Sequence, residues 1–357
     1  MDRRAFSLTL ARPLGTAKGT IRRREGDLIR LDAGEYGIGE ATPLPGWTES
    51  LADCRAALDA VAEAGDEALR AAVDAESHDP LAAASTTLTD ALDDAPAARH
   101  AVESAVLDAR GRGEDRPLAA VLGDDPATTV PVNATVGDGS PEEAVAAAID
   151  AVDAGFSCLK VKVGAGDLDR DVTRLRAIRA AVGDGVTLRA DANAAWDRET
   201  AREAVDAVAS LDLSYLEQPL APDDLDGHAA LRGQGVSIAL DETLASAPVD
   251  AVLEADAADV LILKPMALGG PARAYAVARR ALAAGVDPVV TTTIDAAPAR
   301  TAAVHVAAAI PDVRPCGLAT ASALESDLGP DPAPVEAGTV DVPAEPGVAG
   351  DAFDGLF

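Results

Sequence analysis

Hydrophobic residues along 130–320 fall into two alternating patterns, and their alternation predicts a repeating β/α architecture. Short apolar runs recur roughly every 20–30 residues, which is the spacing of strands joined by crossover helices. Most intervals hold an Ala-rich amphipathic segment such as SPEEAVAAAIDAVDAG at 140–155, which opens with helix-start residues and closes at a glycine. The predicted strands cover residues 130–137, 156–164, 186–193, 213–220, 236–242, 259–265, 287–293 and 316–320.

Eight strands joined by crossover helices predict an all-parallel sheet. The sheet could be open and doubly wound, but such a fold would place a glycine-rich phosphate loop after its first strand. The sequence has no such loop there. Eight near-equal units therefore favour an α/β fold with a closed, TIM-like barrel.

The two ends of the chain do not follow this repeat. Near the N-terminus, alternating residues such as DLIRLDAG (27–34) predict antiparallel strands, and apolar spacing over 50–73 predicts a helix. The C-terminal tail is rich in Pro and Gly. We expect an α+β capping domain formed by both chain ends, with residues 1–125 as its N-terminal part, 126–322 as the catalytic barrel and 323–357 returning to the cap.

The charge balance narrows the classes of partner. The chain of 357 residues has 60 acidic and 30 basic side chains, a net charge of −30. A surface of this sign repels a polyanion, which excludes a nucleic acid held through phosphate contacts. The acids are spread along the chain rather than collected in an acidic tail, and only four of the basic residues are lysines. This composition indicates adaptation to high salt, where screening relieves carboxylate repulsion.

Cysteine usage and hydropathy predict the compartment. Cys54, Cys158 and Cys316 are odd in number and widely separated, which argues against disulfides or a zinc site and favours a reducing cytoplasm. The first residues, MDRRAFSLTLARPLG, do not have the apolar core expected of a signal peptide, and no apolar run approaches the length of a membrane span. We expect a soluble cytoplasmic protein that has no membrane partner, and homo-oligomerisation stays open.

Acidic side chains stand at the ends of three consecutive predicted strands. Asp191, Glu217 and Asp241 are 26 and 24 residues apart, one β/α unit each. Active sites of barrels lie at the C-terminal ends of their strands, so these carboxylates should converge. One such acid alone would more simply cap the next helix or face solvent. Three together repel unless a cation lies among them, and hard oxygen ligands suit Mg²⁺.

Three of the four lysines also fall at predicted strand ends. Lys160 and Lys162 are two apart, so they point to one face of their strand, and Lys264 stands at the end of a later strand. Two neighbouring ammonium groups lower each other's pKa, which would help one of them act as a base. Arginine cannot replace lysine in that role because it does not deprotonate.

The motifs LKVKVG, RADANAAW, LEQPL, ALDET and LILKPMALGG, in this order, resemble those of the enolase superfamily, specifically its muconate-lactonising subgroup. The resemblance implies a (β/α)7β-type barrel and abstraction of a proton α to a carboxylate, the Lys- and Mg²⁺-dependent chemistry known for this superfamily. It also implies Asp191, Glu217 and Asp241 as ligands of Mg²⁺, for which Mn²⁺ can substitute. Lys162 matches the base, Lys160 its neighbour at the substrate carboxylate, and Lys264 the lysine on the opposite face of a small-molecule carboxylate.

Other positions match the superfamily less specifically. The segment GIGEATPLPGWTES (37–50) is similar to its mobile substrate-covering loop, and Gln218 and Trp196 are as readily structural. His305 lies inside a predicted helix, where packing is the simpler role, and Asp295 is interpreted as a helix cap. Residues expected to contact substrate or support the ligands are Asn193, Glu242, Thr292, Thr293, Ala319 and Thr320.

The ends of the last two predicted strands bear on the reaction. Dipeptide epimerases of this subgroup carry Asp-x-Asp on the eighth strand to bind the substrate ammonium, whereas residues 317–320 here read Gly-Leu-Ala-Thr. The stretches TTTID and GLAT are most similar to o-succinylbenzoate synthases, hydro-lyases of menaquinone biosynthesis. An N-acylamino-acid racemase, a muconate-type cycloisomerase and, less simply, a non-catalytic barrel stay open as alternatives.

Overall fold

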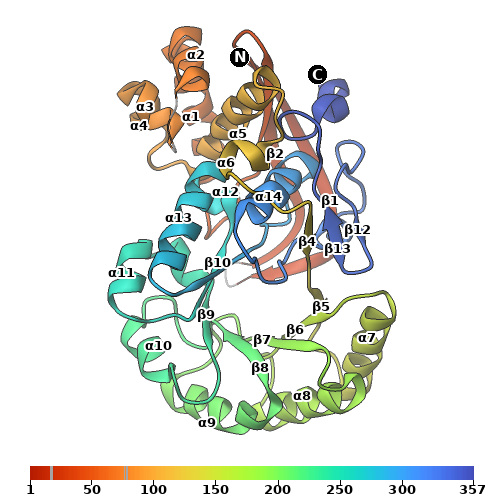
Figure 1. Cartoon of the computed structure of the whole chain (residues 1–357). Helices are drawn as coiled ribbons and strands as arrows, with labels where there is room; N and C mark the ends of the chain where they lie inside the picture. Colours follow the sequence, from red (N-terminus) through yellow and green to blue (C-terminus); the bar gives the residue numbers. More distant parts are fainter. Residues whose placement is uncertain (17–18, 76, 78) are drawn as a thin grey trace.

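The computed structural model describes residues 1–16, 19–75, 77 and 79–357. A parallel barrel forms the lower part of the molecule in Figure 1, and a separate N-terminal unit of three strands and several helices covers its upper end. The predicted α/β class with a TIM-like barrel and a second unit is confirmed.

Seven parallel strands make the barrel wall in the order β11-β10-β9-β8-β7-β6-β5. Two isolated parallel bridges, Val132 to Cys316 and Thr291 to Gly317, connect the two edges of this sheet. The eighth segment predicted at 316–320 therefore closes the wall through single bridges rather than as a full strand. The barrel strands are β5 (Ala134–Val136), β6 (Cys158–Lys162), β7 (Thr187–Asp191), β8 (Leu213–Glu217), β9 (Ile238–Leu240), β10 (Val260–Leu263) and β11 (Asp287–Val290).

Helices follow the strands as the apolar pattern predicts. The helix α7 (Pro141–Asp153) begins with a capping box between Ser140 and Glu143, because each side chain binds the backbone N–H of the other residue. The other barrel helices are α8 (Leu168–Val182), α9 (Arg198–Val208), α10 (Leu225–Leu231), α11 (Val249–Glu254), α12 (Pro265–Leu268), α13 (Pro271–Ala283) and α14 (Ala297–Ala309).

The expected first strand, 130–137, is wrong as a single element. Its first part is β4 (Thr129–Pro131), which pairs with β13 (Thr339–Asp341) in a small antiparallel sheet with β12 (Val335–Glu336). Only β5 joins the barrel. The division arises because C-terminal strands far away in the sequence provide hydrogen-bond partners for β4.

The N-terminal unit is an antiparallel sheet packed against helices. Its strands are β1 (Asp2–Thr16), β2 (Gly19–Asp32) and β3 (Tyr36–Ala41), in that order. The helix predicted over 50–73 is interrupted at Gly65, whose φ of 88° lies in the left-handed region that favours glycine. The helices are α1 (Leu51–Ala64), α2 (Asp66–Asp74), α3 (Pro80–Ala84), α4 (Thr86–Leu92), α5 (Pro96–Gly113) and α6 (Leu118–Leu122).

Two carboxylates of the N-terminal unit cap helices of the barrel. Neither α13 nor α14 has a capping side chain at its own N-cap residue. Glu103 on α5 accepts the N–H of Ala272 in α13 at 2.7 Å, and Glu40 on β3 accepts the N–H groups of Ala296 and Ala299 at 2.9 Å. Both glutamates are fully buried. Hydrogen bonds therefore join the two units, because carboxylates of the N-terminal unit accept the free N–H groups at the N-termini of barrel helices.

The C-terminal segment contacts the N-terminal unit. The N–H of Glu325 donates to Thr9 O on β1 at 2.9 Å, and the N–H of Val348 donates to Asp108 on α5 at 2.7 Å. A terminal 3-10 helix, Gly350–Leu356, completes the chain. Both termini lie at the upper end of the view in Figure 1.

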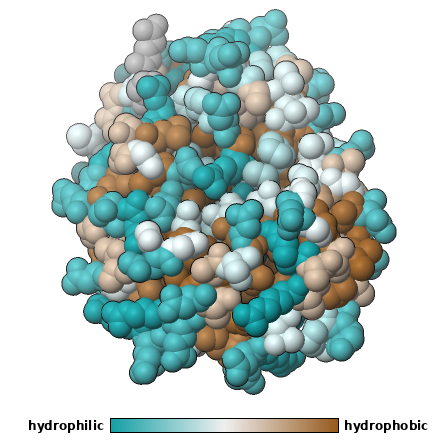
Figure 2. Space-filling model, turned by 60° about the horizontal axis from the view of Figure 1, so that its bottom comes forward, coloured by the Kyte–Doolittle hydropathy of each residue, from teal (hydrophilic) through white to brown (hydrophobic). Residues whose placement is uncertain are grey.

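Polar side chains dominate the surface. The barrel face in Figure 2 is covered largely by hydrophilic residues, with smaller apolar areas between them. Among the described residues, Ile149 and Leu282 are the large hydrophobic side chains that stand exposed. None of the helices in the described residues is long and apolar enough to span a bilayer.

Candidate active site

Three buried carboxylates meet at the C-terminal ends of neighbouring strands. Asp191 is the last residue of β7, Glu217 is the last residue of β8 and pairs with Asp191 in the sheet register, and Asp241 directly follows β9. Their relative exposures are 0%, 0% and 5%. The barrel register brings these residues together because equivalent ends of adjacent parallel strands lie side by side.

The paired lysines of β6 bind these carboxylates. The Nζ atom of Lys160 lies 2.8 Å from both Asp191 Oδ2 and Glu217 Oε1. The Nζ atom of Lys162 donates to Asp191 Oδ2 at 2.7 Å and to Asn193 Oδ1 at 2.8 Å. Lys162 is the more exposed of the pair, with 34% side-chain exposure against 16% for Lys160. Lys162 therefore has the better access to a substrate.

Lys264 approaches the same site from the other side of the acidic group. It follows β10, and its Nζ atom donates to Asp241 Oδ2 at 2.6 Å. The same ammonium lies 3.2 Å from the centroid of the Trp47 ring, a cation–π contact. Trp47 belongs to the 37–50 segment, so this segment of the N-terminal unit contacts the barrel site. The resemblance in sequence pointed to this segment but not to Trp47.

Burial and the neighbouring charges together set the direction of the pKa shifts. Burial alone would lower the pKa of Lys160, but the carboxylates of Asp191 and Glu217 raise it well above its usual value. Burial likewise opposes ionisation of Asp191, whose pKa is nevertheless lowered by the two lysines. Burial and the neighbouring Asp191 raise the pKa of Glu217 to about 8. The expectation that the lysines depress each other's pKa is therefore wrong for Lys160, because carboxylates are its nearest charged neighbours.

The carboxylates retain unused oxygens. Glu217 Oε2 and Asp241 Oδ1 are buried and have no hydrogen-bond partner. A buried oxygen without a partner is costly unless something else satisfies it, and hard oxygen ligands suit Mg²⁺. Over the described ranges, no three acidic, histidine or cysteine side chains, these carboxylates included, are already arranged as a metal-binding group. Each carboxylate instead binds a lysine ammonium. The observation that fits a divalent ion is the pair of unpartnered oxygens, Glu217 Oε2 and Asp241 Oδ1.

Two further polar residues, Asn193 and Gln218, hydrogen-bond to members of this cluster. Asn193 accepts from Lys162 and donates through Nδ2 to Glu242 Oε1 at 3.0 Å. Burial and the neighbouring Asp241 raise the pKa of Glu242. Gln218 is fully buried, and its Oε1 accepts the N–H of Asp241 at 3.0 Å. Gln218, which the sequence left unassigned, therefore positions the backbone of an acidic residue.

Hydroxyl groups line the ends of the last two barrel segments. The Oγ1 atoms of Thr292 and Thr320 are 2.9 Å apart. Ala319, which directly precedes Thr320, is half-buried. Thr293 points elsewhere and donates to Asp295. Asp295 is 2% exposed and does not cap α14, so the cap prediction is wrong. The N–H groups at the start of α14 instead donate to the carboxylates of Glu40 and Asp327.

His305 has the packing role expected of it. It is fully buried in α14, where Nδ1 accepts the N–H of Ala119 at 3.2 Å and Nε2 donates to Val348 O at 2.7 Å. Burial lowers its pKa to about 4, so the ring stays neutral at physiological pH. The histidine therefore connects α14 to α6 and to the C-terminal segment.

Sequence models of two known domains match most of the chain. The model described as "Mandelate racemase / muconate lactonizing enzyme, N-terminal domain" matches residues 3–123, and "Enolase C-terminal domain-like" matches 143–351. The chain belongs to the enolase superfamily, in its muconate-lactonising subgroup. Within this superfamily, the L-Ala-D/L-Glu epimerase of Bacillus subtilis is 30% identical over 96% of this chain and 93% of its own length. The o-succinylbenzoate synthase of Thermobifida fusca is 38% identical over 57% of this chain and 63% of its own.

Solved structures of superfamily members have the same fold. A dipeptide epimerase from Enterococcus faecalis, complexed with Mg and the dipeptide L-Leu-L-Tyr, superposes with a TM-score of 0.86 at 26% identity, covering 98% of each chain. The substrate-liganded L-Ala-D/L-Glu epimerase of Bacillus subtilis gives 0.83 at 29% identity, covering 98% of this chain and 97% of its own.

Proposed function

We propose that this enolase superfamily member is an o-succinylbenzoate synthase, which dehydrates 2-succinyl-6-hydroxy-2,4-cyclohexadiene-1-carboxylate in menaquinone biosynthesis. The observation that carries the proposal is the neutral end of the barrel at Thr292 and Thr320, where two hydroxyls hydrogen-bond to each other. The neighbouring Asp295 is buried and accepts from Thr293, so it is not free to bind a substrate ammonium. Hydroxyls and backbone donors suit a dianionic substrate better than a dipeptide.

The proposed metal ligands are Asp191, Glu217 and Asp241, with Mg²⁺ as the ion and Mn²⁺ as its substitute. Glu217 Oε2 and Asp241 Oδ1 support this assignment because they are buried oxygens without partners. When bound, the ion supplies positive charge that stabilises the substrate carboxylate as negative charge develops on it.

Lys162 is the proposed base on one face of the substrate. Its neutral amine takes the proton from the carbon α to the carboxylate, and the C–H electron pair moves towards that carboxylate. The pair then forms the ring double bond as the C–O bond to the adjacent hydroxyl breaks. The same proton leaves with the hydroxyl as water. Lys160 holds the substrate carboxylate, and Lys264 provides a fixed positive charge on the opposite face.

A second candidate is racemisation or epimerisation of an N-acylated amino acid or dipeptide. It is supported by the 30% identity to the L-Ala-D/L-Glu epimerase, which extends over 96% of the chain. Such a reaction needs a proton carrier on each face of the α-carbon. Lys162 and Lys264 would then exchange protons alternately, whereas a syn dehydration needs only one of them.

The two reactions can be separated by a pair of substitutions. Lys162→Ala should abolish dehydration, with a loss of at least about 10²–10⁴-fold, the usual contribution of a general base. Lys264→Arg keeps the charge but removes proton transfer, so a synthase should lose less activity than a racemase. The assays are the dehydration rate and α-proton exchange of an N-succinylamino acid in D₂O, with Mg²⁺ and molar salt.

The controls make the outcome decisive. Chelation should abolish turnover and added Mg²⁺ should restore it, while circular dichroism verifies that both variants are folded. If folded Lys264→Arg is as inactive in dehydration as Lys162→Ala, the one-base dehydration is refuted. If the wild type exchanges the amino-acid proton faster than it dehydrates the cyclohexadiene, the racemase becomes the better assignment.

A further inference from the structure

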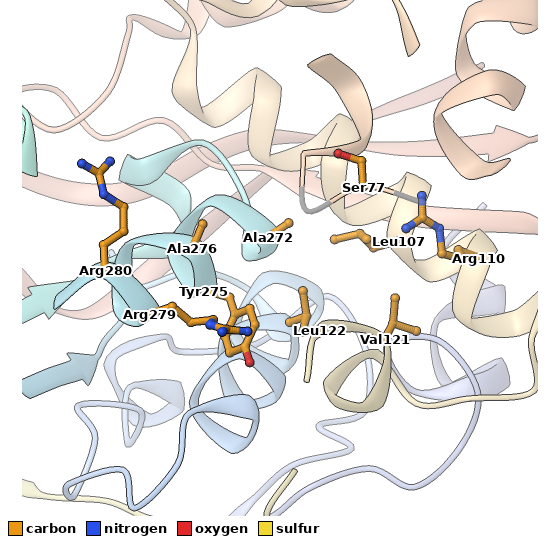
Figure 3. Close-up of a pocket in the computed structure, with 10 residues that line it drawn as sticks. All are labelled: Ser77, Leu107, Arg110, Val121, Leu122, Ala272, Tyr275, Ala276, Arg279 and Arg280. Carbon is orange, nitrogen blue, oxygen red and sulfur yellow. The ribbon is translucent and has the colours of Figure 1, made fainter. Parts of the chain in front are cut away.

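A cavity separate from the candidate active site lies between the N-terminal unit and the barrel. Its volume is about 300 Å³, which is the lower end of the range for small-molecule sites. Helices α5, α6 and α13 line it, and none of the lining residues belongs to the site described above (Figure 3). The apolar part of the lining consists of Leu107, Val121, Leu122, Ala272, Tyr275 and Ala276.

The polar part of the lining is positively charged. Among the described residues that line it, Arg110, Arg279 and Arg280 carry the charge, in a chain that has 60 acidic against 30 basic side chains. Arg280 forms an ion pair with Asp250 and extends away from the other two in Figure 3. The described lining therefore combines apolar side chains with two further guanidinium groups, of which Arg110 has the carboxylates of Glu114 and Asp74 nearby.

These two arginines retain donors for a ligand. Arg279 is exposed and forms no hydrogen bond or ion pair with the described residues, and its guanidinium carbon lies 6.0 Å from the centroid of the Tyr275 ring. Arg110 donates through Nε and Nη2 to the carbonyls of Val73 and Ala72, while its Nη1 has no acceptor in the described part of the chain. Burial lowers the pKa of Arg110. A bound anion would therefore meet donors that are not already satisfied.

Tyr275 adds a hydroxyl group to the lining. Its side chain is buried, with 7% exposure, and its hydroxyl forms no hydrogen bond with the described residues. The hydroxyl lies close to Gly123, because a Cβ added there would be only 3.0 Å from it.

We propose that this cavity, defined by Leu107, Val121, Leu122, Tyr275, Arg110 and Arg279, binds a small organic anion whose apolar body is an aromatic or branched hydrocarbon. The apolar body fills the space beside Leu107, Val121 and Leu122. The anionic group binds the guanidinium of Arg279, whereas Arg110 lies beside Leu107 on the other side of the cavity in Figure 3. Such a ligand would contact α5 and α13 at once and would stabilise the packing of the two units.

The test measures binding of 2-naphthoate by fluorescence titration, with 2-naphthamide as the neutral analogue. The proteins are the wild type, Arg279→Gln, Ala276→Phe and the matched control Arg202→Gln. Arg202 is exposed on α9 and lies outside the cavity lining, so this control removes the same charge elsewhere. Titrations are made at a salt concentration at which circular dichroism shows all four proteins folded.

We expect saturable binding of one naphthoate by the wild type and by Arg202→Gln. Arg279→Gln should weaken binding about fivefold or more, because a charge-assisted contact is lost, and the naphthamide should bind similarly weakly. Ala276→Phe should abolish binding by filling the cavity. The proposal is overturned if the wild type shows no saturable binding, or if naphthamide binds as well as naphthoate. It is also overturned if both cavity variants bind like the control, since naphthoate would then occupy another site such as the barrel centre.

Discussion

Replacing Glu103 by Gln tests whether carboxylates of the N-terminal unit hold it to the barrel. Glu103 is fully buried, binds Arg99 at 2.6 Å and accepts the N–H of Ala272 in α13. Glutamine has one acceptor oxygen in place of two. If the oxygen faces α13, the amide donors face the guanidinium of Arg99, which is itself 1% exposed.

The expected loss of stability follows from this geometry. Breaking a buried ion pair from one side costs about 3–5 kcal/mol, because the other charge is left uncompensated. Arg99 keeps its contacts with Asp79 and Gly269 O, both at 2.7 Å, so we expect about 3 kcal/mol, the lower end. The unfolding entropy of a chain of this length is about 0.75 kcal/mol/K, from roughly 2.1 cal/mol/K per residue. The melting temperature should therefore fall by about 4 °C if the chain unfolds as one unit.

The assay is thermal and denaturant unfolding followed by circular dichroism at molar salt. Glu203→Gln on α9 is the matched control, since this glutamate is exposed and forms no polar contact with the described residues. Its effect should stay within about 0.5 kcal/mol. Equal stability of Glu103→Gln and Glu203→Gln would refute the reasoning that the buried carboxylate joins the two units.

Three further changes have defined outcomes. Gly37→Ala would place a Cβ 1.9 Å from a carbonyl of α5 and should destabilise by about 1–3 kcal/mol or more, whereas Gly185→Ala, with no atom within 4 Å, should be nearly neutral in denaturant unfolding. Burial and Asp295 raise the pKa of Glu40 to about 7, even though Arg24 lies nearby. Between pH 4.5 and about 7, the folded protein therefore binds more protons than the unfolded chain. The stability that comes from protonated Glu40 is lost as pH rises through that window. Melting curves from pH 5 to 8 should show a stability difference between wild type and Glu40→Gln that decreases with pH, and a constant difference would contradict the shift. The melting temperature should also rise from low to molar salt as screening relieves carboxylate repulsion, and a flat or falling trend would argue against adaptation to salt.

Several features of this protein follow from the sequence alone. The strands from β6 to β11 lie within the predicted ranges because their apolar pattern and their flanking helix signals are local. The convergence of Asp191, Glu217 and Asp241 with the lysines could be predicted as well. In a parallel barrel, the residue at the end of each strand is necessarily next to its counterpart on the following strand, so spacing along the chain becomes proximity in space.

The tertiary structure decided what depends on partners far away in the sequence. Pairing with β13 separates β4 from β5, and a strand pattern cannot reveal which distant strand supplies the hydrogen bonds. Asp295 has the local signature of a cap, yet α14 takes its cap from Glu40 on another unit. The pKa of Lys160 is raised because the buried carboxylates of Asp191 and Glu217 lie next to its ammonium group, and their attraction outweighs the effect of burial. In each case the deciding quantity is the set of charges and donors around a buried group, which only the folded chain brings together.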